Sequence, residues 1–93
     1  MLFLVISHPR PERPSEVASS RQAYWSWIEP KLASGECRSA YPRVGRGVAA
    51  TFEVPSNERL HILLTEWAEI IPATFDVYPL VDTEAAKAAL KGA

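Results

Sequence analysis

The chain has 93 residues and a mass of 10.3 kDa, which allows one compact domain. Its 10 Lys and Arg residues nearly balance 11 Asp and Glu residues, so the formal charge of −1 argues against a nucleic-acid partner or a lysine-rich membrane helix. The 47% share of hydrophobic residues argues against disorder, and the one cysteine, Cys37, excludes an internal disulfide.

The chain begins with a short apolar run, residues 1–6. This run is too short for a secretory signal or a membrane span, which predicts a cytoplasmic protein without a membrane partner. Residues 2–6 are rich in strand-forming side chains and predict a buried strand. The prolines at positions 9, 11 and 14 then predict a stiff, extended loop.

A helical pattern follows this loop. Ser15 is a good N-cap, and Tyr24 and Ile28 lie four residues apart, as on one face of a helix. Pro30 is expected to kink this helix or to end it near residue 29, and Gly35 closes the segment.

Two alternating segments, residues 36–43 and 48–54, predict a hairpin because Gly45 and Gly47 lie between them. In the second segment one face is apolar; it consists of Val48, Ala50, Phe52 and Val54. In the first segment, alternation predicts one shared face for Cys37, Ser39, Tyr41 and Arg43. Arg38 then lies on the opposite face, unless an irregularity caused by Pro42 changes the register.

The last third of the chain predicts a helix, a strand and a terminal helix. Ser56 is a plausible cap, apolar residues recur at helical spacing over residues 60–71, and Pro72 ends the pattern. Residues 74–82 alternate as a strand, in which Pro79 favours an edge position or a bulge. The alanine-rich residues 83–93 predict a short helical tail.

The predicted order is therefore strand, helix, strand, strand, helix, strand and tail. This βαββαβ pattern indicates an α+β, ferredoxin-like fold with a four-stranded antiparallel sheet and both helices on one face. We expect a single domain over residues 1–93, with its core in residues 1–82 and a tail at 83–93. Because the first strand is apolar on both faces, the uncovered face of the sheet predicts a homodimer.

Several short motifs resemble those of the muconolactone isomerase family. They are the opening Met-Leu-Phe, the glycine that ends the first helix, and the step Phe52-Glu53-Val54-Pro55-Ser56 followed by Leu60-His61. The resemblance extends over most of residues 1–82. It implies a dimeric α/β barrel, often part of a larger homo-oligomer, that works without a metal or an organic cofactor. The chemistry it implies is a proton shift within a small lactone or a related elimination.

Four residues are candidates for such chemistry. His8 stands where the first strand leaves the sheet and could act as a base, although a solvated loop histidine is the alternative. Arg43 could hold a carboxylate while Tyr41 orients or protonates the substrate, or Arg43 could simply end the hairpin in water. Glu53 is either an acid or base with a raised pKa or a charge at a subunit contact.

Tyr24 and Trp25 are expected to form the wall of the substrate pocket, and Arg38 aligns with a family arginine that follows the helix-ending glycine. The leading hypothesis is a cofactor-independent isomerase or cyclase that acts on a small lactone or carbonyl substrate. One alternative is a non-catalytic dimeric module for small-ligand binding or assembly. The other is a cofactor-free monooxygenase of the same barrel class.

Overall fold

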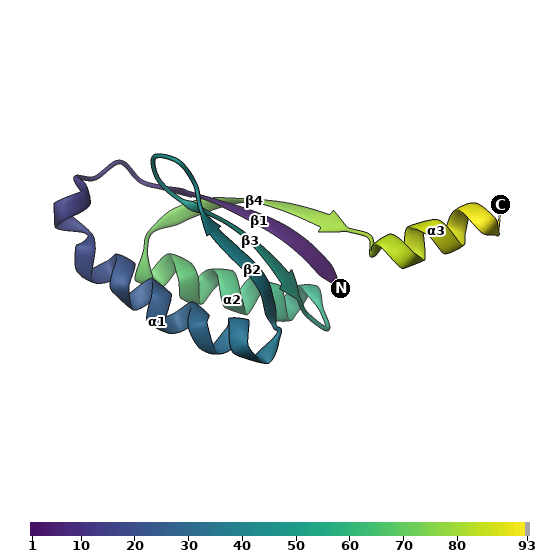
Figure 1. Ribbon diagram of the computed structural model, residues 1–93. Helices are drawn as coiled ribbons and strands as arrows, with labels where there is room; N and C mark the ends of the chain where they lie inside the picture. The colour runs from purple at the N-terminus through teal and green to yellow at the C-terminus, as the bar shows by residue number, and fades with distance from the viewer. Residues whose placement is uncertain (93) are drawn as a thin grey trace.

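Four strands and three α-helices follow one another along residues 1–92, which the computed structural model describes (Figure 1). The predicted tail extends to Ala93, which lies outside the described residues. In chain order the elements are β1 (Leu2–Pro9), the 3₁₀ turn η1 (Pro14–Glu16), α1 (Ala18–Ser34), β2 (Cys37–Pro42), β3 (Val48–Glu53), α2 (Asn57–Ile70), β4 (Ala73–Leu80) and α3 (Thr83–Lys91).

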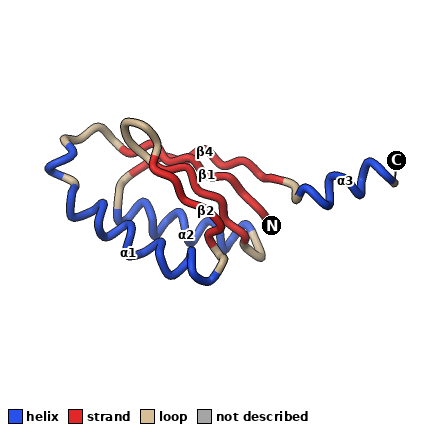
Figure 2. The backbone as a smooth tube through the Cα atoms, viewed as in Figure 1, coloured by secondary structure: helices blue, strands red, loops and turns tan. Residues whose placement is uncertain are grey.

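The strands form one antiparallel sheet in the order β2-β3-β1-β4, and α1 and α2 cover the same face of it (Figure 2). β1 pairs with β3 on one side and with β4 on the other. β4 is an edge strand, where Pro79 is tolerated because one side of the strand has no ladder to disrupt. The predicted βαββαβ order and the ferredoxin-like α+β fold are therefore confirmed.

The core lies between the sheet and the two covering helices. Phe3 and Val5 of β1 point toward the helices and are buried. Ile28 of α1 and Leu63 and Trp67 of α2 meet them from the other side, each with 1% exposure or less. Burial of an aliphatic side chain of this size contributes roughly 1.5–3 kcal/mol, so this layer is the main source of stability.

The opposite side of the sheet, the outer face, carries no helix. Strand register assigns to it Leu2, Leu4, Ile6 and His8 of β1, Ser39 and Tyr41 of β2, Ala49, Thr51 and Glu53 of β3, and Thr74, Asp76, Tyr78 and Leu80 of β4. Its apolar members are partly or largely exposed; Tyr78 is 48% exposed and Leu80 40%.

The first strand is longer than the sequence predicts, because it continues through His8 and Pro9. β3 pairs with β1 only as far as Ile6, whereas β4 follows β1 up to the pair Pro9↔Ala73. The last residues of β1 therefore have an unpaired side, where proline is tolerated. The predicted loop begins only after Pro9.

The first helix begins later and ends later than expected. Ser15 lies in the 3₁₀ turn, and Val17 occupies the N-cap position of α1 without a side-chain cap. Pro30 neither ends the helix nor coincides with a break, and α1 runs to Gly35, a left-handed C-cap with φ of 85°. Pro30 and Ser26, whose carbonyl the proline leaves unbonded, are both exposed, so water can satisfy that carbonyl.

A β-bulge at Arg38 changes the predicted faces of β2. Cys37 pairs with Phe52, whereas Ser39 pairs with the next residue back, Thr51. One extra residue reverses the alternation, so Cys37 is fully buried on the helix side and its Sγ donates to the Ser39 carbonyl at 3.3 Å. The prediction that Cys37 shares a face with Ser39 and Tyr41 is wrong for this reason.

The second helix begins as predicted. The Ser56 hydroxyl accepts a hydrogen bond from the Arg59 amide at 3.1 Å, which caps α2. The Arg59 side chain then reaches across to the residue before β2 and forms a two-point ion pair with Glu36, at 2.7 and 2.9 Å. This pair ties the start of α2 to the segment that links α1 and β2.

The Glu36–Arg59 pair predicts a pH dependence of stability. The hydrogen bond from Arg59 lowers the pKa of Glu36 below its ordinary value, and the charge of Arg59 acts in the same direction. A lowered folded-state pKa means that this stabilisation is present above the unfolded pKa and is lost as the pH falls through the folded one. Because both side chains are partly exposed, we expect about 1 kcal/mol or less.

The measurement is urea unfolding of the wild type and of Glu36→Gln between pH 3 and 7. The difference between the two proteins should shrink as the pH falls below about 4, close to the ordinary Glu pKa. A difference that stays constant over this range would contradict the assignment.

Candidate functional site

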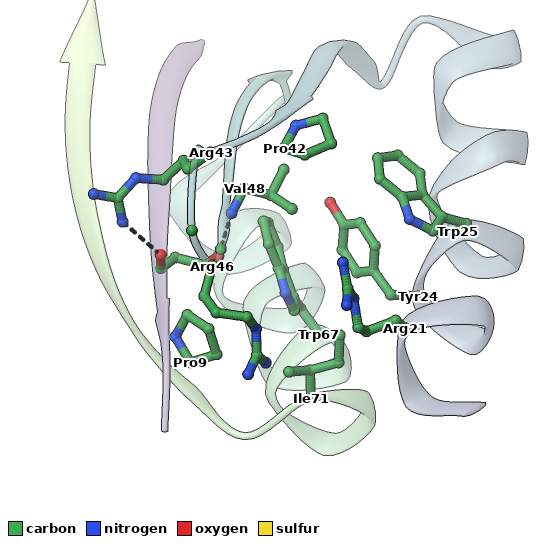
Figure 3. A pocket seen from close by; sticks show the side chains of 13 residues that line it. Pro9, Arg21, Tyr24, Trp25, Pro42, Arg43, Arg46, Val48, Trp67 and Ile71 are labelled. Atoms are coloured by element: carbon green, nitrogen blue, oxygen red, sulfur yellow. Dashed lines mark hydrogen bonds between the residues drawn. The ribbon is translucent and has the colours of Figure 1, made fainter. Parts of the chain in front are cut away.

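A cavity of about 80 Å³ lies between the sheet and the helices, beside the β2–β3 hairpin (Figure 3). Three aromatic side chains form its helix wall: Tyr24 and Trp25 of α1 and Trp67 of α2. The hairpin and the strands supply the opposite wall. The other lining residues are Ser7, Pro9, Arg21, Pro42, Arg43, Gly45, Arg46, Gly47, Val48 and Ile71.

Tyr24 has the most unusual position in this cavity. Its side chain is 1% exposed, and within residues 1–92 its hydroxyl is the buried side-chain polar atom that has no hydrogen-bond partner. The ring packs against Trp25 and Trp67, with centroid distances of 5.2 and 4.9 Å. Figure 3 shows the hydroxyl end of Tyr24 pointing from α1 toward the hairpin side of the cavity. An unpartnered buried hydroxyl costs about 1–3 kcal/mol, so the fold tolerates a loss of stability at this position.

The Tyr24 hydroxyl is a hydrogen-bond donor rather than a base. Burial raises the pKa of this phenol well above its ordinary value, and the nearby Cys37 acts in the same direction. The phenol therefore stays neutral at physiological pH. A neutral phenol offers one O–H to an oxygen or nitrogen acceptor placed in the cavity.

Arginines give the cavity a positive rim. Arg21 precedes Tyr24 by three residues and so shares its face of α1. Arg46 extends from the hairpin, is partly buried, and donates to the Glu12 carbonyl at 3.4 Å. The lining that the structure describes contains arginines and neutral groups but no carboxylate or imidazole, so it suits a small anion.

The hairpin that carries Arg46 is held against β1 by close backbone packing. Gly47 has φ of 99°, and a Cβ at this position would lie 2.5 Å from the Ser7 carbonyl oxygen. Beside it, the amide of Val48 donates to the Ser7 hydroxyl at 2.8 Å, and the amide of Arg43 donates to the Gly47 carbonyl at 2.9 Å. Gly47 is therefore the position at which the cavity wall requires glycine.

Gly47→Ala is expected to lower the free energy of unfolding by about 2–4 kcal/mol, because it combines left-handed strain with a clash against backbone. Gly45→Ala is the matched control: Gly45 also has a positive φ, of 96°, but a Cβ there meets nothing within 4 Å. Chemical denaturation of both variants measures the difference. Equal losses of unfolding free energy in the two variants would show that the contact with Ser7 does not contribute to stability.

Two of the predicted catalytic residues, His8 and Arg43, come together: Arg43 is among the lining residues of the cavity, but its guanidinium reaches His8 on the outer face. His8 Nε2 lies 2.7 Å from Asp76 Oδ2, and Arg43 Nη1 lies 3.3 Å from His8 Nδ1 and 3.1 Å from the Ser7 carbonyl. Since Arg43 has only protons to donate, Nδ1 is the acceptor and Nε2 carries the hydrogen that Asp76 receives. The three side chains satisfy one another and hold the start of the hairpin to the sheet.

The other predicted site residues do not converge. Tyr41 is 70% exposed on the outer face, Glu53 is exposed at the end of β3 where it pairs with Leu2, and Arg38 is exposed at the bulge. Tyr24 and Trp25, expected to be pocket wall, do line the cavity. The sequence reasoning missed Arg21 and Arg46. The position of Arg21, three residues before Tyr24 on one helix, is the signal that could have identified it.

Within residues 1–92, none of the helices combines the length and the apolar character needed to cross a bilayer. In the same part of the chain, His, Cys, Asp and Glu side chains nowhere gather in threes with a geometry that could hold a metal ion.

The fold is shared with an enzyme of known structure. The 5-chloro-2-hydroxyhydroquinone dehydrochlorinase (TftG) from Burkholderia phenoliruptrix AC1100, in complex with 2,5-dihydroxybenzoquinone, is similar with a TM-score of 0.70. The match covers 91% of this chain and 98% of that chain at 20% sequence identity, so it shows a common fold. No curated protein sequence matches the chain. The model of the family described as Domain of unknown function (DUF3303) matches residues 1–93, and the chain therefore belongs to the DUF3303 family.

Proposed function

We propose that the cavity binds a small, planar substrate with an acidic hydroxyl or enolisable carbonyl, and that the protein promotes a proton shift on it without a cofactor. The observation that carries this proposal is the unpartnered Tyr24 hydroxyl, buried at the cavity beside the arginines. Ligand binding would give this donor the partner that the fold does not supply. The resemblance to muconolactone isomerases supports the choice of a proton shift over other chemistries.

The lining residues suit stabilisation of an enolate. Trp25 and Trp67 offer faces for a flat ligand, the Tyr24 hydroxyl donates to the developing oxyanion, and Arg21 and Arg46 offset its charge. None of these groups accepts a proton at neutral pH. The proton therefore leaves the substrate carbon for a water molecule at the cavity mouth and returns from water at a second carbon. One such donor contributes roughly 10²–10³ in rate in other enzymes.

The ligand of the dehydrochlorinase TftG fits the same description. 2,5-Dihydroxybenzoquinone is flat and bears acidic hydroxyl groups, and that enzyme acts on a chlorinated hydroxyhydroquinone. A ligand of this type would satisfy both Tyr24 and the arginines in this chain. The roles proposed here do not extend to Tyr41, Glu53 or Arg38, whose side chains lie away from the cavity; His8 and Arg43 position the hairpin.

The experiment measures proton exchange directly. Unsaturated γ-lactones and 1,3-diketones are incubated with the protein in D₂O, and deuterium incorporation is followed by NMR. We expect exchange above the buffer rate that falls at least ten-fold in Arg46→Gln and is unchanged in Arg13→Gln, an exposed arginine outside the cavity. Exchange at the buffer rate would overturn the isomerase proposal. Binding without exchange would favour the non-catalytic module, and oxygen consumption with phenols would favour the monooxygenase.

A homodimer through the outer face is part of the same proposal, and a higher homo-oligomer could build on it. Leu4 lies between Thr51 and Tyr78 near the middle of this face. Leu4→Asp is expected to break this outer-face contact and so to lower the fraction of associated chains at micromolar concentration, because a buried unpaired charge is costly at an interface. Sedimentation velocity makes the measurement, with Ile62→Asp on the exposed side of α2 as the control. A wild-type monomer at this concentration would contradict the dimer.

A further inference from the structure

The terminal helix α3 does not pack against the rest of the domain. It projects from the end of β4, away from the sheet and from both covering helices (Figure 1). Every described residue from Val81 to Gly92 is exposed, including Val81 at 71% and Leu90 at 79%. A nine-residue helix is marginal on its own in water, because few hydrogen bonds repay the cost of nucleation. Its helical state therefore calls for a packing partner.

α3 has two distinct faces. At helical spacing, one side carries Ala85, Ala86, Ala89 and Leu90, and the other carries Glu84, Lys87, Ala88 and Lys91. The apolar side has the form of a helix surface that packs against another element. The small alanines allow close approach to it, and Leu90 is its largest side chain.

A groove with an apolar floor, like the apolar side of α3, runs between α2 and β4. It is shallow and open to solvent, and it is lined by His61, Leu64, Thr65, Ala68, Glu69, Phe75 and Val77. Its floor is apolar and incompletely covered, since Val77 faces the helix side of the sheet and is still 40% exposed. The helices α1 and α2 therefore leave this part of the sheet open, with room for another helix.

The length and charge of the groove match α3. Its α2 wall, from His61 to Glu69, and α3 both comprise nine residues, and each rises by about 12 Å. α2 carries three glutamates against one arginine, and Glu69 lies at the groove. α3 carries Lys87 and Lys91 against Glu84. Of the three glutamates only Glu69 lines the groove, and it could pair with a lysine of an amphipathic helix packed there.

We propose that α3 is an exchange arm that packs into the α2–β4 groove of a second copy of this chain. In the structure α3 continues beyond the end of β4 and projects away from its own groove, with Val81 and Asp82 between the strand and the helix. The Asp82 carboxylate accepts a hydrogen bond from the Glu84 amide at 2.9 Å and so caps the N-terminus of α3. Exchange of one element between two protomers buries both apolar surfaces. The inference concerns a surface other than the cavity and stands independently of the proposed function.

Site-directed cross-linking tests the exchange. Two differently tagged full-length chains, one with Leu90→Cys and one with Ala68→Cys, are mixed and mildly oxidised. We expect a disulfide-linked heterodimer whose linked peptides join positions 68 and 90. Ala88→Cys replaces Leu90→Cys in the control, since position 88 lies on the polar side of the same helix; its yield should be at least five-fold lower. The native Cys37 is buried and does not compete.

Two outcomes would overturn the proposal. Equal yields from positions 88 and 90 would show that the apolar side of α3 does not select the groove. A chain carrying both Leu90→Cys and Ala68→Cys that closes mainly on itself would show that the groove receives its own arm. Because none of these substitutions touches the core, circular dichroism melting curves should match the wild type, which separates failed docking from failed folding.

Discussion

Tyr24→Phe is expected to weaken ligand binding and to stabilise the protein at the same time. The substitution removes a hydroxyl that is buried without a partner, so the free energy of unfolding should rise by about 1 kcal/mol. The same hydroxyl is the proposed donor to an anionic ligand oxygen, and such a bond contributes roughly 1.5–3 kcal/mol, or about 10- to 100-fold in affinity. A purely structural role for this hydroxyl would not predict that the affinity falls while the stability rises.

The probe is 2,5-dihydroxybenzoquinone, and the readout is quenching of tryptophan fluorescence, because Trp25 and Trp67 line the cavity. Tyr78→Phe is the control for affinity: it removes a hydroxyl from the outer face, outside the cavity, and should leave ligand binding unchanged. Since burial raises the pKa of Tyr24, this donor should not be lost by ionisation between pH 7 and 9. Unchanged affinity in Tyr24→Phe would remove the central support for the proposed site.

Trp67→Ala should have the largest effect on stability. Trp67 is 1% exposed and joins the core to the cavity: its ring lies 4.9 Å from Tyr24, 5.1 Å from Phe75 and 6.3 Å from Phe52. Truncation of a buried tryptophan costs about 3–5 kcal/mol. In a chain of this size that lowers the melting temperature by roughly 15–30 °C.

The measurement is thermal unfolding followed by circular dichroism. Trp67→Phe, which keeps an aromatic ring, should lose less than half as much as Trp67→Ala. Ile62→Ala on the exposed side of the same helix should stay within about 0.5 kcal/mol of the wild type. A loss below 1 kcal/mol in Trp67→Ala would show that its neighbours close the space, and that the ring is not central to the core.

The parts of the fold that depend on local pattern could be predicted from the sequence. The alternation over residues 48–54 and the helical period over residues 60–71 report burial on one face, and both segments form as expected. Ser56 and Gly35 act as helix caps because their side-chain or backbone properties suit those positions wherever they occur. These signals need no knowledge of distant residues.

The candidate site could be predicted only in part, because it depends on register and on distant contacts. One extra residue at Arg38 reverses the faces of β2, and no local signal in the sequence announces a bulge. Tyr24 and Trp25 could be identified as pocket wall from helix spacing. Arg46 could not, since its place beside the cavity follows from the contact of Gly47 with Ser7, forty residues away in the chain.

Because Cys37 is buried, the reactivity of its thiol reports whether the protein unfolds. The thiol is fully enclosed, and burial raises its pKa, so the reactive thiolate is scarce in the native state. A water-soluble thiol reagent can therefore modify the chain only when β2 separates from the helices. The labelling rate of this single cysteine then measures how often the core opens, without any engineered cysteine.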